Sequence, residues 1–282
     1  MLTGQPSRTI MLPAILRAAH QILDQPPIFT DPVAIDLLPE TSERAILAAT
    51  DDLRSPHMTR LRALMALRSR FAEDRLAAAT VRGIRQHVIL AAGLETFPWR
   101  QPPFTRDMQI FAVDHPATLA WTKQRMQERG LLQPLNLTRV PADLEEQRLG
   151  QQLVALGFAD HPTFCSALGL AQYLTDAAVN ALLRFAASLP SGSELVLSFV
   201  VGDEDLSGDD LAIARTSIAG AEAKGEPWRT RMRPEEIISR FHAVGFADVF
   251  HLKPELGQDR YFAGRLDGLR APRWEQLIAA VT

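Results

Sequence analysis

The sequence predicts an α/β fold with a mostly parallel, seven-stranded sheet, and three patterns lead to this prediction. From residue 86 to about 200, short apolar runs alternate with segments of helical spacing, as expected for repeated βα units with right-handed crossovers. Two further apolar runs near the C-terminus are separated only by a loop, so they should pair antiparallel. Residues 1–85 carry helical patterns alone. We expect an N-terminal helical extension, 1–85, over a core of residues 86–282, in one compact domain.

The N-terminal region begins with an amphipathic helix, predicted over residues 7–23, because Ile15, Leu16, Ala19 and Leu23 recur at helical spacing. Three prolines between residues 26 and 32 then favour an extended segment. Further helices are predicted over residues 42–49 and 59–82.

The core is predicted to alternate strands with helices. The expected strands are 87–91, 109–113, 136–140, 163–168, 193–200, 247–252 and 259–264. The expected helices are 116–129, 147–156, 176–189, 209–223, 234–245 and 273–281.

The stretch from residue 86 to 118 carries the first sign of function. Val88, Ile89 and Leu90 end in the small residues 91–93, and small residues at the carboxyl end of a buried strand let a ligand approach the backbone. Asp114 ends the next apolar run, 21 residues beyond Gly93. That interval is close to the roughly 20 residues after which a carboxylate holds a ribose in nucleotide-binding βαβ units. The alternative is an Asp that caps the following helix.

Two other positions are candidate ligands. Asp143 follows the third strand, where it could accept a hydrogen bond from an adenine amino group while Leu144 packs on the ring; a turn or capping Asp is the alternative. Arg68 and Arg70 lie on the helix that precedes the core, and one of them could bind a carboxylate bidentately. A solvated charged face is the alternative there.

Composition excludes several classes of protein. The chain is 46% hydrophobic and 22% charged, with a net charge of −3 and scattered basic residues, which argues against nucleic acid as the main partner. It lacks the apolar run of a membrane span or a signal peptide, and Cys165 is its single cysteine, so we expect a cytoplasmic protein without a disulfide. The histidines show no metal-binding spacing, and no metal site is predicted. Ser166 lacks the GxSxG context of a nucleophile, and Tyr173 could face a cofactor or a substrate.

Several phrases in order resemble one known family from end to end. They are SRTIMLPAILRAAH, PPIFTDPVA, ALRSRFAED, LAAGLET, VDHPAT, ADL, FCSALGLAQYLT, GEPW, GFADV and RYFAGRLDGLR. On these phrases the chain resembles the class I S-adenosylmethionine-dependent methyltransferases of the leucine carboxyl methyltransferase-like group.

The resemblance implies a Rossmann-like sheet of seven strands with a terminal antiparallel hairpin, helices on both faces, and an N-terminal lid. It also implies S-adenosyl-L-methionine as cofactor and roles for matched residues. Arg68 would bind the methionine carboxylate, Asp114 the ribose, and Asp143 with Leu144 the adenine. The remaining implied cofactor contacts are Ala91, Ala92, Gly93, His115 and Leu168.

The chain departs from this family in the turn that follows the first predicted strand and at the end of the fourth predicted strand. Ala91 replaces the usual first glycine, which matters if a positive φ is needed there, and Glu95 replaces an aspartate. Leu168 stands where many relatives carry Glu, and Ala167 where some carry Trp. The change at Ala167 is expected to enlarge the pocket near the transferred methyl group.

The resulting hypothesis is methyl transfer to a small molecule, with O-methylation of a carboxylate or a hydroxyl group favoured. A carboxylate is already a nucleophile at neutral pH and needs no general base. We expect no nucleic-acid or membrane partner and a monomer or homodimer. Two alternatives remain: a methyltransferase-fold binding protein with little activity, which Ala91 suggests, and a nicotinamide-dependent oxidoreductase, which the βαβ spacing suggests. The sequence leaves the acceptor unidentified.

Overall fold

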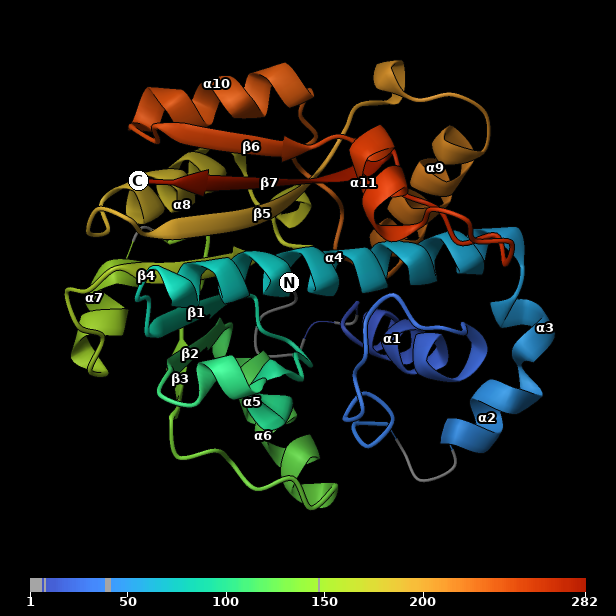
Figure 1. Cartoon of the computed structure of the whole chain (residues 1–282), viewed down its shortest axis with the longest axis horizontal. Helices are drawn as coiled ribbons and strands as arrows, with labels where there is room; N and C mark the ends of the chain where they lie inside the picture. The colour runs from blue at the N-terminus through green and yellow to red at the C-terminus, as the bar shows by residue number, and fades with distance from the viewer. Residues whose placement is uncertain (1–6, 8, 39–41, 147) are drawn as a thin grey trace.

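The computed structural model describes residues 7, 9–38, 42–146 and 148–282, with the side chains of residues 42–44 excluded. Its centre is a seven-stranded sheet in the order β3-β2-β1-β4-β5-β7-β6, in which β7 runs antiparallel to both of its neighbours (Figure 1). The strands are β1 (Gln86–Leu90), β2 (Gln109–Asp114), β3 (Leu137–Pro141), β4 (Thr163–Ala167), β5 (Glu194–Val200), β6 (Asp248–Leu252) and β7 (Glu275–Val281). The predicted mostly parallel α/β sheet is confirmed.

The central strands are buried on both faces. Every residue of β1, β4 and β5 is buried, which is why apolar residues occupy consecutive positions in them, as in Val88, Ile89 and Leu90 of β1. Leu90, the last residue of β1, pairs with Val113 of β2 on one side and with Ala167 of β4 on the other. From β1 the chain adds β2 and β3 on one side and then returns to add β4 on the other side, so the strand order reverses between β1 and β4. In open α/β sheets, ligands bind at the carboxyl ends of the strands next to such a reversal.

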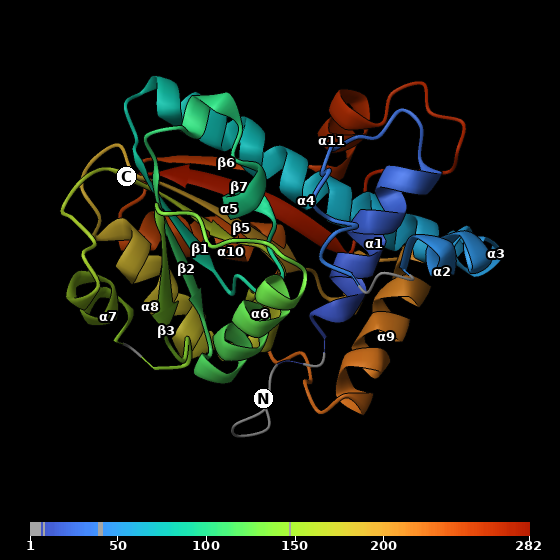
Figure 2. The same ribbon diagram turned by 90° about the horizontal axis from the view of Figure 1, so that it is seen from below.

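Helices cover both faces of the sheet (Figure 2). The helices are α1 (Met11–Leu23), α2 (Ser42–Ala48), α3 (Thr50–Leu53), α4 (Pro56–Val81), α5 (Phe97–Arg100), α6 (Pro116–Glu128), α7 (Leu149–Ala155), α8 (Asp176–Ala187), α9 (Gly208–Ala223), α10 (Pro234–Val244) and α11 (Pro254–Tyr261). Short 3₁₀ turns are η1 (Pro103–Thr105), η2 (Ala171–Tyr173) and η3 (Asp203–Asp205). Ile89 of β1 packs in one core with Leu76 of α4, whereas its neighbour Val88 packs in another core with Leu183 of α8.

Most predicted elements are found where the sequence placed them, including all helices before residue 86. The first helix is shorter than predicted, since it begins at Met11, and residue 8 lies outside the described part of the chain. Residue 147, the predicted start of α7, also lies outside it. In the described residues no helix is both long and apolar enough to cross a lipid bilayer.

The last two predicted elements are wrong in type. Residues 259–264 were expected as a strand, but helix α11 runs through Tyr261 and begins with Pro254 at a favoured first helical position. Residues 273–281 were expected as a helix, because Glu, Gln, Leu and Ala favour one, yet residues 275–281 form strand β7. Burial between β5 and β6 overrides this propensity. The expected antiparallel pair is thus β6 with β7, joined through α11 rather than by a tight turn.

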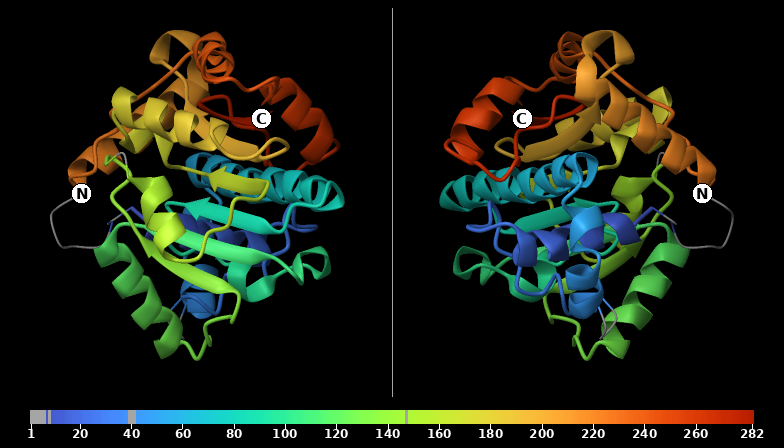
Figure 3. Two further views of the ribbon diagram at one scale, coloured as in Figure 1. Left: turned by 90° about the vertical axis from the view of Figure 1, so that its left-hand side faces the viewer. Right: turned by 90° about the vertical axis from the view of Figure 1, so that its right-hand side faces the viewer.

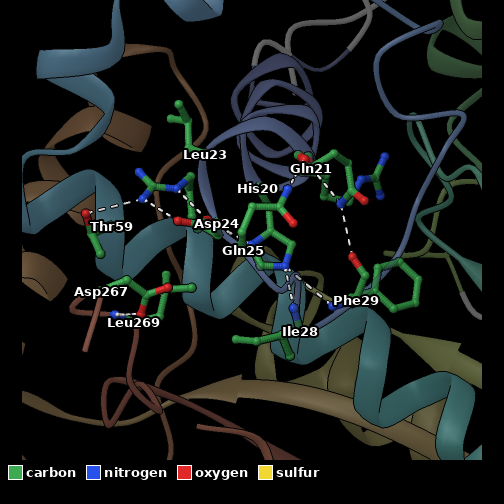
Figure 4. A network of polar contacts seen from close by, with 12 residues as sticks. His20, Gln21, Leu23, Asp24, Gln25, Ile28, Phe29, Thr59, Asp267 and Leu269 are labelled. Carbon is green, nitrogen blue, oxygen red and sulfur yellow. Dashed lines mark hydrogen bonds and ion pairs between the residues drawn. The ribbon is translucent and has the colours of Figure 1, made fainter. Parts of the chain in front are cut away.

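A buried polar network fixes the helical extension on the core (Figure 4). Asp24, which follows α1, accepts hydrogen bonds from Arg62 Nε and Nη2 of α4, both at 2.9 Å. His20 Nδ1 lies 2.8 Å from the same carboxylate, and its Nε2 accepts the Ile28 N–H at 3.0 Å, so Nδ1 carries the proton. These contacts hold α1 against α4 and thereby place the N-terminal residues of α1 over the carboxyl edge of the sheet.

Candidate active site

A cavity of about 750 Å³ lies at the carboxyl ends of β1, β2 and β4, and α1, α4 and α9 form its outer walls. The right-hand view of Figure 3 faces this side of the molecule. All ten residues predicted to bind cofactor or substrate line the cavity: Arg68, Ala91, Ala92, Gly93, Asp114, His115, Asp143, Leu144, Leu168 and Tyr173. The structure therefore brings together in one place residues that span more than a hundred positions of the sequence.

The turn after β1 adopts a left-handed backbone at two positions. Gly93 has φ 48°, and Ala91 has φ 56°, which makes it the one described non-glycine residue with positive φ. The family glycine that Ala91 replaces would have adopted this conformation freely, whereas an alanine is strained there. Ala92 N donates to Val113 O at 3.0 Å, so the turn is anchored to the end of β2.

Asp114 closes the same turn from β2. Its two carboxylate oxygens accept backbone N–H groups from Gly93 at 2.8 Å and from His115 at 2.7 Å. Burial raises the pKa of Asp114 above its ordinary value and outweighs the hydrogen bonds from Gly93, His115 and Thr118, which lower it. The helix cap itself is His115, whose Nδ1 accepts the Ala117 N–H at 3.3 Å. Asp114 is thus the residue that shapes the turn and also faces the cavity.

Asp143 and Leu144 form the opposite end of the cavity, after β3. Asp143 Oδ1 accepts the Glu145 N–H at 3.0 Å, so the turn interpretation of this residue is correct. The side chain is nevertheless exposed and lines the cavity beside the half-buried Leu144. Both interpretations of Asp143 are compatible with its position.

The structure separates the two arginines of α4. Arg70 points away from the cavity and donates to Asp74 at 2.9 Å. Arg68 lines the cavity, and its Nε donates to Glu275 Oε1 at 2.6 Å while Nη2 contacts the other carboxylate oxygen. Gly169, after β4, has φ 67°, a left-handed conformation that favours glycine, and a Cβ there would lie 2.8 Å from Arg68 Nη1. Glu275 escaped the sequence analysis because its segment was predicted as a helix.

The end of β4 contributes Leu168 but not its neighbour. Leu168 lines the cavity, whereas Ala167 is fully buried in the core, because successive side chains of a strand face opposite sides. The expected effect of Ala167 on the pocket is therefore wrong. Tyr173 in η2 faces the cavity near Arg68, and burial raises the pKa of its phenol.

The sequence analysis predicted no contacts for two acidic residues that line the cavity, Glu95 and Glu226. Glu95 accepts the Phe97 N–H at 3.0 Å at the start of α5 and pairs with Arg17 of α1 at 3.3 Å, which joins α1 to the segment that follows β1. Glu226, after α9, accepts hydrogen bonds from Ser7 at 2.8 Å and Thr9 at 2.5 Å. No short motif marks these pairs, because their partners lie far apart in the sequence.

Other reactive side chains lie outside this cavity. Ser166 Oγ is 2.9 Å from His87 Nε2 on the sheet, and burial lowers the pKa of His87 to about 3. Cys165 is buried, and burial raises the pKa of its thiol to about 12. In the described part of the chain, no group of three or more His, Cys, Asp or Glu is arranged to hold a metal ion.

Comparison with known proteins agrees with this arrangement. The family model for leucine carboxyl methyltransferases matches residues 10–187. The chain belongs to the leucine carboxyl methyltransferase family. The predicted membership is confirmed, and the enzyme is a class I methyltransferase that depends on S-adenosylmethionine. The match ends at the last residue of α8, so strands β5, β6 and β7 and helices α9, α10 and α11 of this methyltransferase lie beyond it.

One relative matches this methyltransferase over its whole length, and others match part of it. YktD of Bacillus subtilis (strain 168), provisionally named an S-adenosyl-L-methionine-dependent methyltransferase, is 29% identical over 100% of this chain and 99% of its own. A provisionally named methyltransferase of Mycolicibacterium gilvum (strain PYR-GCK) is 31% identical over 70% of this chain and 75% of its own.

Solved structures share the fold at low identity. A methyltransferase-like protein from Thermobifida fusca YX has a TM-score of 0.59 at 16% identity, over 100% of this chain and 96% of its own. A DUF574 family protein from Streptomyces avermitilis MA-4680 has a TM-score of 0.57 at 18% identity, over 96% of each chain. The antiparallel β7 inside the sheet and the family match together leave no support for a nicotinamide-dependent oxidoreductase.

Proposed function

We propose that this methyltransferase transfers a methyl group from S-adenosylmethionine to an oxygen of a small molecule. The observation that carries the proposal is the spatial order of the cavity walls. Along the carboxyl edge of the sheet, the order is the cation Arg68 of α4, the turn of small residues 91–93, the buried Asp114, and the exposed Asp143 beside Leu144. This order corresponds to the carboxylate, sulfonium, ribose and adenine of the cofactor.

The residues fit the cofactor chemically. Arg68 keeps Nη1 outside its pair with Glu275, so a guanidinium N–H remains for a carboxylate. The Asp114 carboxylate accepts two backbone N–H groups and the Thr118 hydroxyl, so its two oxygens together retain one acceptor site for a ribose hydroxyl. Hydroxyl donors would also favour the charged form of a carboxylate whose pKa burial raises.

The chain's own contribution to the reaction is binding, orientation and exclusion of water. When bound, S-adenosylmethionine supplies an electrophilic methyl group on a positively charged sulfur. The 91–93 turn, Leu168 and Tyr173 all line the cavity. Leu12 and Leu16 of α1 cover it, which keeps water from competing with the acceptor oxygen. A carboxylate acceptor requires no proton transfer from the protein, so positioning is sufficient for its methylation.

Calorimetry on the pure protein tests the cofactor site. S-Adenosylmethionine and S-adenosylhomocysteine should bind, and Asp114→Ala and Arg68→Ala should each weaken binding by about 10- to 100-fold, the loss expected for charge-assisted hydrogen bonds. Arg70→Ala is the matched control, because Arg70 lies on the same helix outside the cavity. A thermal melt of each variant checks folding. Absence of binding at millimolar ligand, or equal losses at Arg68 and Arg70, would contradict the assignment.

A labelling experiment tests the acceptor atom. The enzyme is incubated with methyl-labelled cofactor and pooled carboxylic acids, phenols and amines. We expect label in methyl esters or ethers, and the esters are distinguished by their lability in base. Label confined to N-methyl products would refute the proposed O-methylation.

A further inference from the structure

A second, smaller cavity lies between α4 and the sheet, and we call it the recess. It has a volume of about 50 Å³ and is lined by residues of α4, β1, β4 and α5. Five of its lining residues also line the large cavity: Ser69, Ala91, Ala92, Glu95 and Leu168. The recess therefore adjoins the large cavity at the turn after β1 and at the end of β4.

His87 of β1 lines the recess with a buried ring that lacks one hydrogen-bond partner. Only 5% of His87 is exposed. Its Nε2 lies 2.9 Å from Ser166 Oγ, whereas Nδ1 is buried and has no hydrogen-bond partner among the described residues. Phe97 and Phe164 contact the ring edge-on, with centroid distances of 4.9 and 5.2 Å, so a rotation toward another partner would break both contacts. Because buried polar atoms in folded proteins are nearly always hydrogen-bonded, Nδ1 indicates a ligand in the recess.

The chemistry of the recess favours a neutral ligand. Burial lowers the pKa of His87 to about 3, so the ring is neutral at pH 7, and Nδ1 is either an N–H donor or an acceptor. Glu73 and Glu95 also line the recess, so an anion would be repelled. A cation is not required, because arginines already pair with both carboxylates. Water satisfies either state of Nδ1 without adding a charge.

The recess has the size and the polar walls that buried water needs. A buried water requires roughly 10–15 Å³ of such space and about two to four polar partners, so the recess has room for about three. The hydroxyl groups of Ser69 and Ser166 and the carboxylates of Glu73 and Glu95 line the same recess as His87. Water at Nδ1 therefore has further partners within the recess.

We propose that the recess is an internal hydration site, in which water binds His87 Nδ1 and exchanges with solvent through the large cavity. Each lining residue of the recess is buried or half-buried, and the residues shared with the large cavity mark the exit. Ala91 and Ala92 belong to the walls of both cavities, so cofactor bound against this turn closes the exit. The exit route, unlike the hydration itself, rests on the proposed function.

A high-resolution crystal structure of the protein tests the hydration site. We expect an ordered water at about 2.7–3.2 Å from His87 Nδ1. His20 is the matched control, because it is also buried, but its Nδ1 lies 2.8 Å from Asp24 and its Nε2 accepts the Ile28 N–H at 3.0 Å. Neither nitrogen of His20 should bind water. Electron density without a water at His87 Nδ1, or with a protein group bonded to it, would overturn the proposal.

Magnetic relaxation dispersion of water oxygen-17 tests the site in solution, because it detects waters that stay bound for longer than the protein takes to tumble. Ala72→Leu fills the recess from α4 and should remove the contribution of the recess water. Ala78→Leu is the matched control, since Ala78 is exposed on the same helix and lines neither cavity, and it should change nothing. Equal dispersion in the wild type and in folded Ala72→Leu would refute the hydration site. If a thermal melt shows that Ala72→Leu does not fold, the crystal structure of the wild type decides.

Saturating S-adenosylhomocysteine tests the exit route. The residence time of the recess water should lengthen when this ligand covers the turn, and Ala72→Leu should show no such change. An unchanged residence time in the wild type would refute exchange through the large cavity. If S-adenosylhomocysteine does not bind, the cofactor assignment is wrong, while the crystal structure and the Ala72→Leu comparison, made on the protein alone, still decide the hydration site.

Discussion

The turn after β1 contains a strained alanine, Ala91, next to an unstrained one, Ala92. Glycine substitutions at these two positions should change the free energy of unfolding in opposite directions. Ala91 has φ 56°, whereas Ala92 is not in the left-handed region. A left-handed non-glycine residue costs roughly 1–2 kcal/mol, which Ala91→Gly would remove. The glycine also increases the entropy of the unfolded chain and so costs about 0.4–1 kcal/mol. Ala91→Gly should therefore raise the free energy of unfolding by about 0.5–1 kcal/mol.

Ala92→Gly is the matched control, because it increases the entropy of the unfolded chain by the same amount but relieves no backbone strain. It should lower the free energy of unfolding by about 0.4–1 kcal/mol, so the two variants should differ by roughly the strain itself, 1–2 kcal/mol. Urea unfolding followed by circular dichroism measures both on the apo protein. Equal destabilisation by the two substitutions would show that Ala91 is not strained and that the turn tolerates the methyl group at no cost.

Three further predictions concern other buried groups. Arg62→Met should lower the free energy of unfolding by about 3–5 kcal/mol, because it leaves the Asp24 carboxylate buried without its cation. Burial raises the pKa of Asp24, but hydrogen bonds from His20 and Arg62 outweigh burial and lower the pKa below its ordinary value of 3.8. The stabilisation by this carboxylate is therefore present above pH 3.8 and is lost as the pH falls through the lower pKa of the folded protein. Urea titrations at pH 7 and at acid pH measure both effects, and a loss below 1 kcal/mol would contradict the network. Affinity for S-adenosylhomocysteine should fall as the pH drops through the raised pKa of Asp114, because a protonated carboxyl group has one acceptor fewer. Calorimetry of Asp114→Asn should show no such fall. If the two proteins gave parallel pH profiles, Asp114 would be excluded as the group that titrates. Cys165, with a buried thiol whose pKa is raised to about 12, should react with a thiol reagent only under unfolding conditions, and rapid labelling of the native protein would refute its burial.

The candidate site was largely predictable because its residues sit at positions that the fold defines. Strand ends such as Gly93 and Asp114 are recognised from apolar runs that stop abruptly, and parallel strands bring such ends to one edge. Which arginine of α4 faces the cavity was not settled by spacing alone, and the structure places Arg68 inside and Arg70 outside. The adjacent Ala167 was misjudged, because a shift of one residue along a strand reverses the side on which the side chain lies.

The sequence by itself determined the α/β class, the βα rhythm of the core, the helical N-terminal extension and the strand-end residues, since these depend on local periodicity and on small residues at turns. Only the tertiary structure decided that residues 275–281 form a strand, because burial between β5 and β6 outweighs the helical propensity of the segment. The partners of long-range pairs were likewise decided by the fold: Glu275 with Arg68, and Asp24 with Arg62. These contacts join segments distant along the chain, and no local pattern encodes which distant segments will meet.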